Sequence, residues 1–185
     1  MQKTKPFITK AVMFFSILLL APTLLYAATP AAPRDPSEYF FNSTLGDFTE
    51  ELATAKEEGK KGIMLFFEQD ECPFCHYMKL RVLNQPEVQA YFRKNFLIFP
   101  IDIEGDVEMT DFHGKVMKQK DFAFKVNRVR ATPVMAFYDL TGKQVARYTG
   151  KTASIEEFML LGKYVADGEY KKMRFSKYKR QHMKN

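Results

Sequence analysis

The chain has two cysteines, and only two residues separate them in the tetrapeptide Cys72-Pro73-Phe74-Cys75. Two thiols at this spacing can form a small disulfide, bind a metal ion together or attach a haem covalently. A disulfide that closes so short a loop removes little entropy from the unfolded chain, so it stabilises a fold only weakly. The pair is therefore better explained by chemistry than by stability, and its surroundings must decide which chemistry.

The N-terminal residues 1–27 have the features of a secretory signal. Lysines are frequent in the first ten residues, and an apolar stretch follows over residues 11–26. We expect cleavage after Ala27. An uncleaved membrane anchor is the less favoured alternative, because Pro22 interrupts a stretch that would need ~20 apolar residues to span a bilayer. The signal predicts a periplasmic protein, whose cysteines meet an oxidising environment.

The formal net charge of +6 is concentrated at the two ends of the chain. Basic residues dominate the signal and the tail over residues 168–185, whereas the part between them is mildly acidic. Charged tails are usually only exposed to water, so we interpret this one as a solvated helix end or a disordered segment. Contact with an anionic membrane surface or an acidic partner is the alternative. Export and the terminal position of the charge argue against nucleic acid as a partner.

Hydrophobic patterns predict alternating helices and strands. Strands are expected at residues 63–67, 96–103, 134–138 and 144–148, the last two joined by a turn at Gly142. Helices are expected at residues 43–59 (capped by Ser43), 75–83, from Pro86, at 116–126, and after a capping box at Ser154. This order indicates an α/β domain over residues 42–167, with helices on both faces of a mixed sheet and a short linker over residues 28–41 before it.

The cysteine pair follows the first predicted strand directly and lies where a helix begins, which is a redox arrangement. Unpaired N–H groups and the helix dipole favour negative charge there, so Cys72 is expected to be the nucleophilic thiolate. Cys75, one turn further in, is shielded and would resolve the mixed disulfide formed on Cys72. Pro73 suits a first helical turn and stiffens the active-site loop, which also contains Phe74.

These features make the chain resemble the thioredoxin superfamily over residues 42–167. The resemblance rests on the cysteine motif after the first strand, Thr132-Pro133 before the strand at 134–138, and Gly150 after the last strand. It implies a thioredoxin fold in which the bond before Pro133 is cis and the proline packs beside the disulfide. It also implies that the backbone of Thr132 pairs with bound substrate.

Residues 66–75 and 103–114 are similar to a narrower group, the SoxW-like exported thioredoxins. This similarity implies a protein that reduces disulfides outside the cytoplasm and receives its electrons across the membrane. The implied partners are protein disulfides and a membrane electron donor. No cofactor and no metal are expected beyond the redox-active Cys72–Cys75 disulfide.

Three ionisable residues near the pair could modulate it. The buried aspartate that assists the resolving thiol in the family would fall at Phe66, which cannot accept a proton. Glu68 could substitute, although carboxylates near the end of a strand are usually hydrated. Glu71, directly before Cys72, opposes the thiolate and favours a reductase over an oxidase, whereas positive charge on His76 would partly offset this effect.

We therefore expect a protein-disulfide reductase, with a disulfide oxidase or isomerase of the same fold as the nearest alternative. Two alternatives belong to other classes. Cys72-Pro73-Phe74-Cys75-His76 also matches the attachment pattern of a c-type haem, although the buried strands oppose a helical haem domain. Zinc could use the same side chains with His113, but His113 lies in a distant predicted loop and no second C-x-x-C occurs.

Overall fold

The computed structural model describes residues 1–2 and 31–183, and the chain divides into two units, Met1–Pro30 and Ala31–Asn185. From residue 3 onward, the predicted signal lies outside the described residues and stays a prediction. Among the residues that are described, no helix has both the length and the apolar character needed to cross a bilayer. All that follows concerns the second unit.

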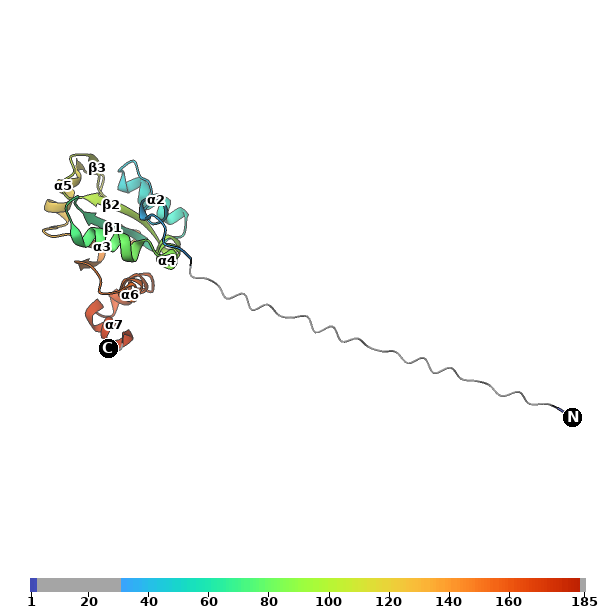
Figure 1. The fold of residues 1–185 in the computed structure, drawn as a ribbon. Coiled ribbons are helices and arrows are strands. Elements are labelled where there is room, and N and C mark those ends of the chain that lie inside the picture. The colour runs from blue at the N-terminus through green and yellow to red at the C-terminus, as the bar shows by residue number, and fades with distance from the viewer. Residues whose placement is uncertain (3–30, 184–185) are drawn as a thin grey trace. The chain divides into compact units, whose positions relative to one another are not determined.

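The second unit alternates helices and strands, as the hydrophobic patterns predict (Figure 1). In chain order the elements are α1 (Pro36–Tyr39), α2 (Phe48–Glu57), β1 (Gly62–Glu68), α3 (Pro73–Met78), the π-helical turn η1 (Lys79–Leu83), α4 (Pro86–Asn95), β2 (Phe96–Asp102), β3 (Glu108–Thr110), β4 (Val116–Lys118), α5 (Gln119–Asp121), the π-helical turn η2 (Phe122–Val126), β5 (Val134–Tyr138), β6 (Gln144–Thr149), α6 (Ile155–Ala166), the 3-10 turn η3 (Glu169–Lys171) and α7 (Phe175–His182). The helix predicted at residues 75–83 corresponds to α3 and η1 together.

A four-stranded sheet in the order β2-β1-β5-β6 forms the centre of the unit. β1 pairs with β2 in parallel and with β5 in antiparallel orientation, and β5 and β6 form an antiparallel hairpin. Gly142 has a φ of +80° in the turn of this hairpin, which is the predicted use of that glycine. The predicted α/β architecture with a mixed sheet is confirmed.

The sheet separates two apolar clusters, so both faces of β1 are buried. Met64 and Phe66 belong to the cluster that contains Phe158 of α6, whereas Leu65 belongs to the cluster that contains Phe48 of α2. Figure 1 shows α2 and α6 on opposite sides of the strands. Because side chains alternate along a strand, this two-sided burial fixes β1 in place, together with the residues that follow its end.

Residues at the start of the predicted domain and directly before it also contribute to the fold. The ring of Phe40 is fully buried and lies 5.8 Å from that of Phe92 and 6.1 Å from that of Phe158. Asn42 covers the edge of β2, because its N–H donates to the Ile98 carbonyl and its side-chain oxygen accepts the Ile98 N–H. The edge strand beside β1 is therefore protected from pairing with another chain at this point.

The start predicted for the first long helix is wrong. α2 begins at Phe48, and its cap is Asp47, whose carboxylate accepts the N–H of Thr49 at 2.8 Å. Leu45 is fully exposed instead of facing the core. The physical reason is Gly46, whose φ of +89° breaks the helical path between Ser43 and Asp47.

The helix predicted over residues 116–126 is also partly wrong. Residues 116–118 form β4, which pairs with β3 from the predicted acidic loop. Val116 and Val126 are exposed, while Phe122 and Ala123 are buried as predicted. The Asp111 carboxylate stabilises the turn of this hairpin by accepting the backbone N–H groups of His113 and Lys115, a local organisation that helical periodicity does not reveal.

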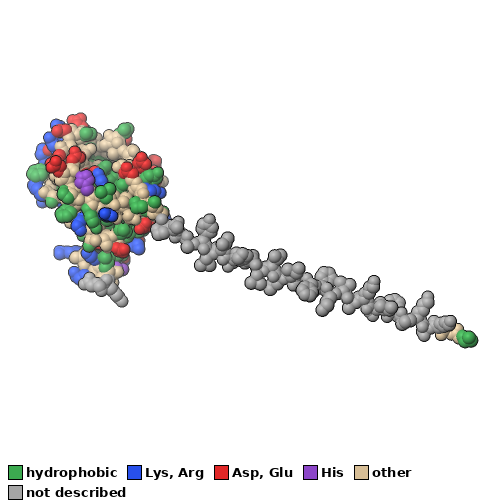
Figure 2. Space-filling model, in the orientation of Figure 1, with side chains coloured by type: hydrophobic (Ala, Val, Ile, Leu, Met, Phe, Trp, Pro, Cys, Tyr) green, Lys and Arg blue, Asp and Glu red, His purple; other side chains and the backbone are tan. Residues whose placement is uncertain are grey.

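The basic tail contains a helix, α7, that packs against α6. Tyr178 is buried, with its ring 5.3 Å from that of Tyr164, and Lys179 Nζ lies 2.6 Å from the carboxylate of the buried Glu157. The interpretation of a merely solvated tail is wrong for α7, because these residues make tertiary contacts. In the view of Figure 2, basic side chains still gather over the lower part of the unit, where Figure 1 places α6 and α7.

Candidate functional site

Cys72 and Cys75 lie at the junction between the end of β1 and the start of α3. They form a disulfide, and the two residues are 4% and 2% exposed. Cys72 is the N-cap of α3, and its Sγ accepts the backbone N–H of Cys75 at 3.0 Å. Pro73 occupies the first helical position, where its missing N–H costs nothing. This is the placement that the sequence predicts for the pair.

The environment of Cys72 favours negative charge on its sulfur. Its Sγ is already a hydrogen-bond acceptor at a helix N-terminus, where the free N–H groups carry partial positive charge. A thiolate would accept the Cys75 N–H more strongly than a disulfide sulfur does, because ionised acceptors form stronger hydrogen bonds. The geometry can therefore stabilise Cys72 as a nucleophile when the pair is reduced.

The loop that precedes β5 lies beside the same end of the sheet. The Thr132–Pro133 bond is cis, as the resemblance implies, and the next residue, Val134, pairs with Phe67 of β1. Thr132 Oγ1 donates to the side-chain oxygen of Gln69 at 3.1 Å, which ties this loop to the residues before Cys72. The structure thus brings the cysteine motif and the predicted substrate-binding pair to one edge of the sheet.

The loop that follows β6 reaches the same edge. The N–H of Gly150 donates to the Pro133 carbonyl at 2.8 Å, and Lys151 Nζ lies 4.7 Å from the ring centroid of Tyr77 on α3. Phe74, between the cysteines, is 52% exposed. The exposed ring of Phe74 and the ammonium group of Lys151 therefore lie at the same end of the sheet as the disulfide. Sequence reasoning had not identified Tyr77 or Lys151.

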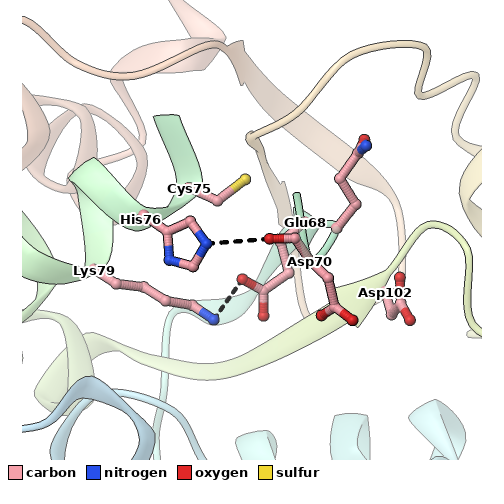
Figure 3. A pocket seen from close by; sticks show the side chains of 7 residues that line it. Glu68, Asp70, Cys75, His76, Lys79 and Asp102 are labelled. Carbon is pink, nitrogen blue, oxygen red and sulfur yellow. Dashed lines mark hydrogen bonds and ion pairs between the residues drawn. The ribbon is translucent and has the colours of Figure 1, made fainter. Parts of the chain in front are cut away.

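A cavity of about 120 Å³ lies behind the disulfide on the side of Cys75. Its lining residues come from β1, the loop after it, α3, η1 and the end of β2: Glu68, Gln69, Asp70, Cys75, His76, Lys79 and Asp102. Figure 3 shows these side chains around the cavity, with Lys79 directed at Glu68 and His76 directed at the Asp70 backbone. Two of the predicted modulators, Glu68 and His76, thus line the same cavity. Three further charged residues line it as well and were not predicted to do so: Asp70, Lys79 and Asp102.

Glu68 is held by an ion pair. Lys79 Nζ lies 2.6 Å from a carboxylate oxygen of Glu68, and the Glu68 side chain is only 18% exposed. The Glu68 carboxylate is therefore not freely hydrated, as carboxylates at strand ends usually are. The pairing could not be read from the sequence, although Lys79 lies four residues after Cys75 and so one turn along the same helical face.

The two other predicted modulators are exposed. His76 Nε2 lies 3.1 Å from the Asp70 carbonyl oxygen, which can only accept, so this ring nitrogen carries a hydrogen. Glu71 is exposed in the turn directly before Cys72. Within the described residues, three or more His, Cys, Asp or Glu side chains do not converge as a metal-binding group.

Comparison with known proteins identifies the family. The model of the family described as the thioredoxin-like domain matches residues 48–166, which is more than half of the chain. The chain belongs to the thioredoxin-like family. The superfamily expected from the sequence is therefore confirmed, and the mixed sheet with its flanking helices is a thioredoxin fold. Phe66, where the resemblance places an aspartate, is fully buried in the core.

Solved structures support the same fold at low identity. A thioredoxin-fold protein from Helicobacter pylori has a TM-score of 0.58 at 20% identity, covering 66% of this chain and 84% of its own. A thioredoxin from Thermus thermophilus has a TM-score of 0.50 at 23% identity, covering 64% and 83%. DsbH oxidoreductase has a TM-score of 0.50 at 22% identity, covering 70% and 88%. No curated protein matches the thioredoxin-like chain described here.

Proposed function

We propose that this protein is a thiol-disulfide oxidoreductase that reduces disulfides of other proteins in the periplasm. The observation that carries the proposal is the Cys72–Cys75 disulfide at the start of α3, in which Cys72 Sγ accepts a helix N-terminal N–H. The thioredoxin-like family supports it, as does the fold shared with a protein named DsbH oxidoreductase. The pair is then the reactive group itself, and no separate cofactor is needed.

The reaction consists of two thiol-disulfide exchanges. In the reduced protein, the Cys72 thiolate attacks one sulfur of a substrate disulfide, so that one substrate thiolate leaves and a mixed disulfide forms. Cys75 then loses its proton and attacks Cys72 Sγ, which releases the second substrate thiolate and forms the Cys72–Cys75 disulfide. Two electrons pass to the substrate, whose two sulfurs each take up a proton. A two-electron donor must then restore the dithiol.

We propose that the substrate chain is held by the loops at this edge of the sheet. The backbone of Thr132 pairs with the extended substrate, and Pro133 packs beside the sulfurs. The position of this loop, tied to Gln69 by the Thr132 hydroxyl and to Gly150 through the Pro133 carbonyl, supports that role. The exposed ring of Phe74 adds apolar contact for the partner.

The charges around the pair favour reduction over oxidation. Asp70 and Glu71 precede Cys72 directly, and negative neighbours oppose a thiolate. A less stabilised thiolate gives a couple that is less oxidising. We further propose that residues 1–27 direct export and that a donor in the membrane re-reduces the protein.

The test is a reductase assay on insulin with variants of each cysteine. Cys72→Ser is expected to abolish activity, because the attacking sulfur is lost. Cys75→Ser is expected to accumulate mixed disulfides, visible on non-reducing gels, because the resolving sulfur is lost. Undiminished activity in Cys72→Ser, or trapping by Cys72→Ser in place of Cys75→Ser, would refute the assignment.

A further inference from the structure

Two cations at the active-site end of the sheet are stacked on exposed aromatic rings. The guanidinium carbon of Arg130 lies 3.4 Å from the ring centroid of Phe124, and Lys151 Nζ lies 4.7 Å from that of Tyr77. Phe124 is 52% exposed and Tyr77 is 36% exposed. An aromatic ring attracts a cation and restricts its motion, but it leaves the positive charge intact. Both charges are therefore held in place and remain available to a partner.

The protein itself does not neutralise these two cations. Arg130 and Lys151 are exposed, and no ion pair among residues 31–183 includes either of them. Lys125, which lies on the same π-helical turn as Phe124, differs from them, because its Nζ is 3.0 Å from a carboxylate oxygen of Asp121. An anion on another molecule can therefore pair with Arg130 and Lys151 without breaking an ion pair inside the described part of the chain.

Both cations are close to the loop that is proposed to hold the substrate. Arg130 precedes Thr132 by two residues. Lys151 directly follows Gly150, whose N–H donates to the Pro133 carbonyl at 2.8 Å. A substrate chain that pairs with the Thr132 backbone therefore lies beside both charges when its sulfur reaches the reactive cysteine.

The rings place the two cations on different sides of this loop. Phe124 belongs to η2, where Phe122 and Ala123 pack in the apolar cluster on the α2 side of the sheet. Tyr77 belongs to α3, where Met78 packs in the apolar cluster on the α6 side. The loop before β5 enters the sheet between these two layers. A chain bound along this loop therefore has a cation on each side.

Strand order separates these cations from the carboxylates at the same end of the sheet. Asp102 ends β2, and Asp70 and Glu71 follow β1, whereas Arg130 precedes β5 and Lys151 follows β6. Because the order is β2-β1-β5-β6, these acidic groups lie in one half of this end of the sheet and the two cations lie in the other half. Potentials of opposite sign orient a charged partner and exclude partners of the wrong charge.

Binding of a substrate protein must remove water from the two cations. Cys72 is only 4% exposed, so a substrate disulfide has to approach closely before its sulfur can be attacked. Loss of water from an unpaired charge is unfavourable, and a carboxylate brought against that charge offsets the cost. A partner that brings a cation to the same place is rejected by repulsion.

We propose that Arg130 and Lys151 select protein substrates that have acidic residues on one side of the reactive cysteine, where the bound chain lies over the β5–β6 half of the site. The planar guanidinium of Arg130 can bind a carboxylate through two parallel hydrogen bonds, and Lys151 binds one as a point charge. Both residues determine specificity and take no part in the exchange of electrons. The inference names the substrate class of the oxidoreductase proposed above and rests on that function.

The test compares peptide disulfides that differ only in two positions beside the cysteine, which carry glutamate, glutamine or lysine. Each peptide is made with these positions before the cysteine and again with them after it, so that the preferred order reports the direction of the bound chain. Reduction by pre-reduced protein is followed in a single turnover. In one of the two orders, the second-order rate constant for the glutamate peptide should exceed that for the glutamine peptide about tenfold at low salt. This ratio should fall toward one at about 1 M salt, where the screening length is about 3 Å.

Arg130→Gln combined with Lys151→Gln should bring the ratio to about one, and Arg130→Lys combined with Lys151→Arg should keep most of the preference, because charge carries it. Lys125→Gln is the matched control, since it removes a cation that Asp121 already neutralises, and it should leave the ratio unchanged.

Equal rate constants for the glutamate and glutamine peptides in both orders would overturn the inference. An unchanged ratio in the double glutamine variant would overturn it as well, and so would an equal loss in Lys125→Gln, which would indicate an effect of net charge alone. Wild-type protein that reduces none of the peptides would instead refute the proposed oxidoreductase function.

Discussion

Phe74 is an exposed residue of the active-site motif. It lies between two buried cysteines, yet its ring is 52% exposed, so the structure keeps an apolar surface beside the reactive sulfur. An exposed aromatic ring stabilises no core, but a protein partner that covers it gains the free energy of its burial. We interpret Phe74 as a contact for substrate proteins.

Replacing Phe74 by Ala is expected to weaken the binding of protein substrates while leaving the chemistry intact. Burial of a phenylalanine ring contributes roughly 1.5–3 kcal/mol, so KM for a protein substrate should rise about tenfold or more, with kcat nearly unchanged. Reaction with a small aromatic disulfide should not change. Leu80→Ala is the control, because Leu80 is also exposed but lies in η1, after α3. Equal effects of both variants on KM would contradict this role.

Residue types and spacing were enough to place the two cysteines and Pro73 between a strand and a helix, because this motif is local in sequence. The positions of Thr132 and Pro133 were expected only from the resemblance to the thioredoxin superfamily. Lys79 was missed for the opposite reason. Its partner Glu68 is eleven positions earlier, and only the packing of η1 against the end of β1 brings the two charges to 2.6 Å. Tyr77 of α3 and Lys151 of the loop after β6, which are distant in sequence, were missed in the same way.

At the scale of elements, long apolar runs predicted the strands well. β1 and β2 are continuous apolar runs because both their faces are covered, and this pattern needs no knowledge of partners. Short elements were predicted less accurately, since a three-residue strand such as β4 has too little periodicity to be distinguished from a helix end. The start of α2 failed because Gly46 and Asp47 override the helical pattern that begins earlier.

α7 is joined to the body by a buried carboxylate. Burial raises the pKa of Glu157, but hydrogen bonds from Lys179, the Ala153 N–H and the Tyr148 hydroxyl outweigh it, so the pKa lies below its ordinary value of 4.5. A depressed folded-state pKa contributes stability that is fully present above the ordinary value and is lost as pH falls through the folded-state pKa. The docking of α7 should therefore weaken in acid.

Lys179→Met is expected to lower the free energy of unfolding by about 1–3 kcal/mol at pH 7, because the Glu157 carboxylate stays buried without its cation. The difference from wild type should shrink as the pH falls below 4.5 and through the lowered folded-state pKa of Glu157, because the carboxylate then becomes neutral in the wild type as well. Urea unfolding at several pH values measures this. Lys177→Met, an exposed lysine of the same helix, is the control. A loss that persists undiminished in acid would contradict the role of the ion pair.

At the scale of the whole molecule, the fold places three loops at the same end of the four-stranded sheet: the loop before α3, the loop before β5 and the loop after β6. The thioredoxin-like match ends at residue 166, but the core continues beyond it through Tyr178 of α7 and begins before it with Phe40. The segments outside the family match therefore support the scaffold. Their contribution was not predicted, because single aromatic residues in short polar stretches give no periodic signal.

The direction of electron flow is also a property of the whole site. Acidic residues before Cys72, the Pro73-Phe74 pair between the cysteines and the solvated position of His76 together determine how stable the Cys72 thiolate is relative to the disulfide. No single one of these residues decides whether the protein reduces or oxidises its partners. A measurement on the Cys72–Cys75 pair reports the combined effect of all these residues.

The reduction potential of the Cys72–Cys75 couple, titrated against glutathione, is that measurement. For a protein that reduces disulfides we expect a value between about −200 and −270 mV, where glutaredoxins and thioredoxin lie. A value near about −120 mV, typical of a strong disulfide-forming oxidant, would contradict the account, as would a pair that does not interconvert between dithiol and disulfide.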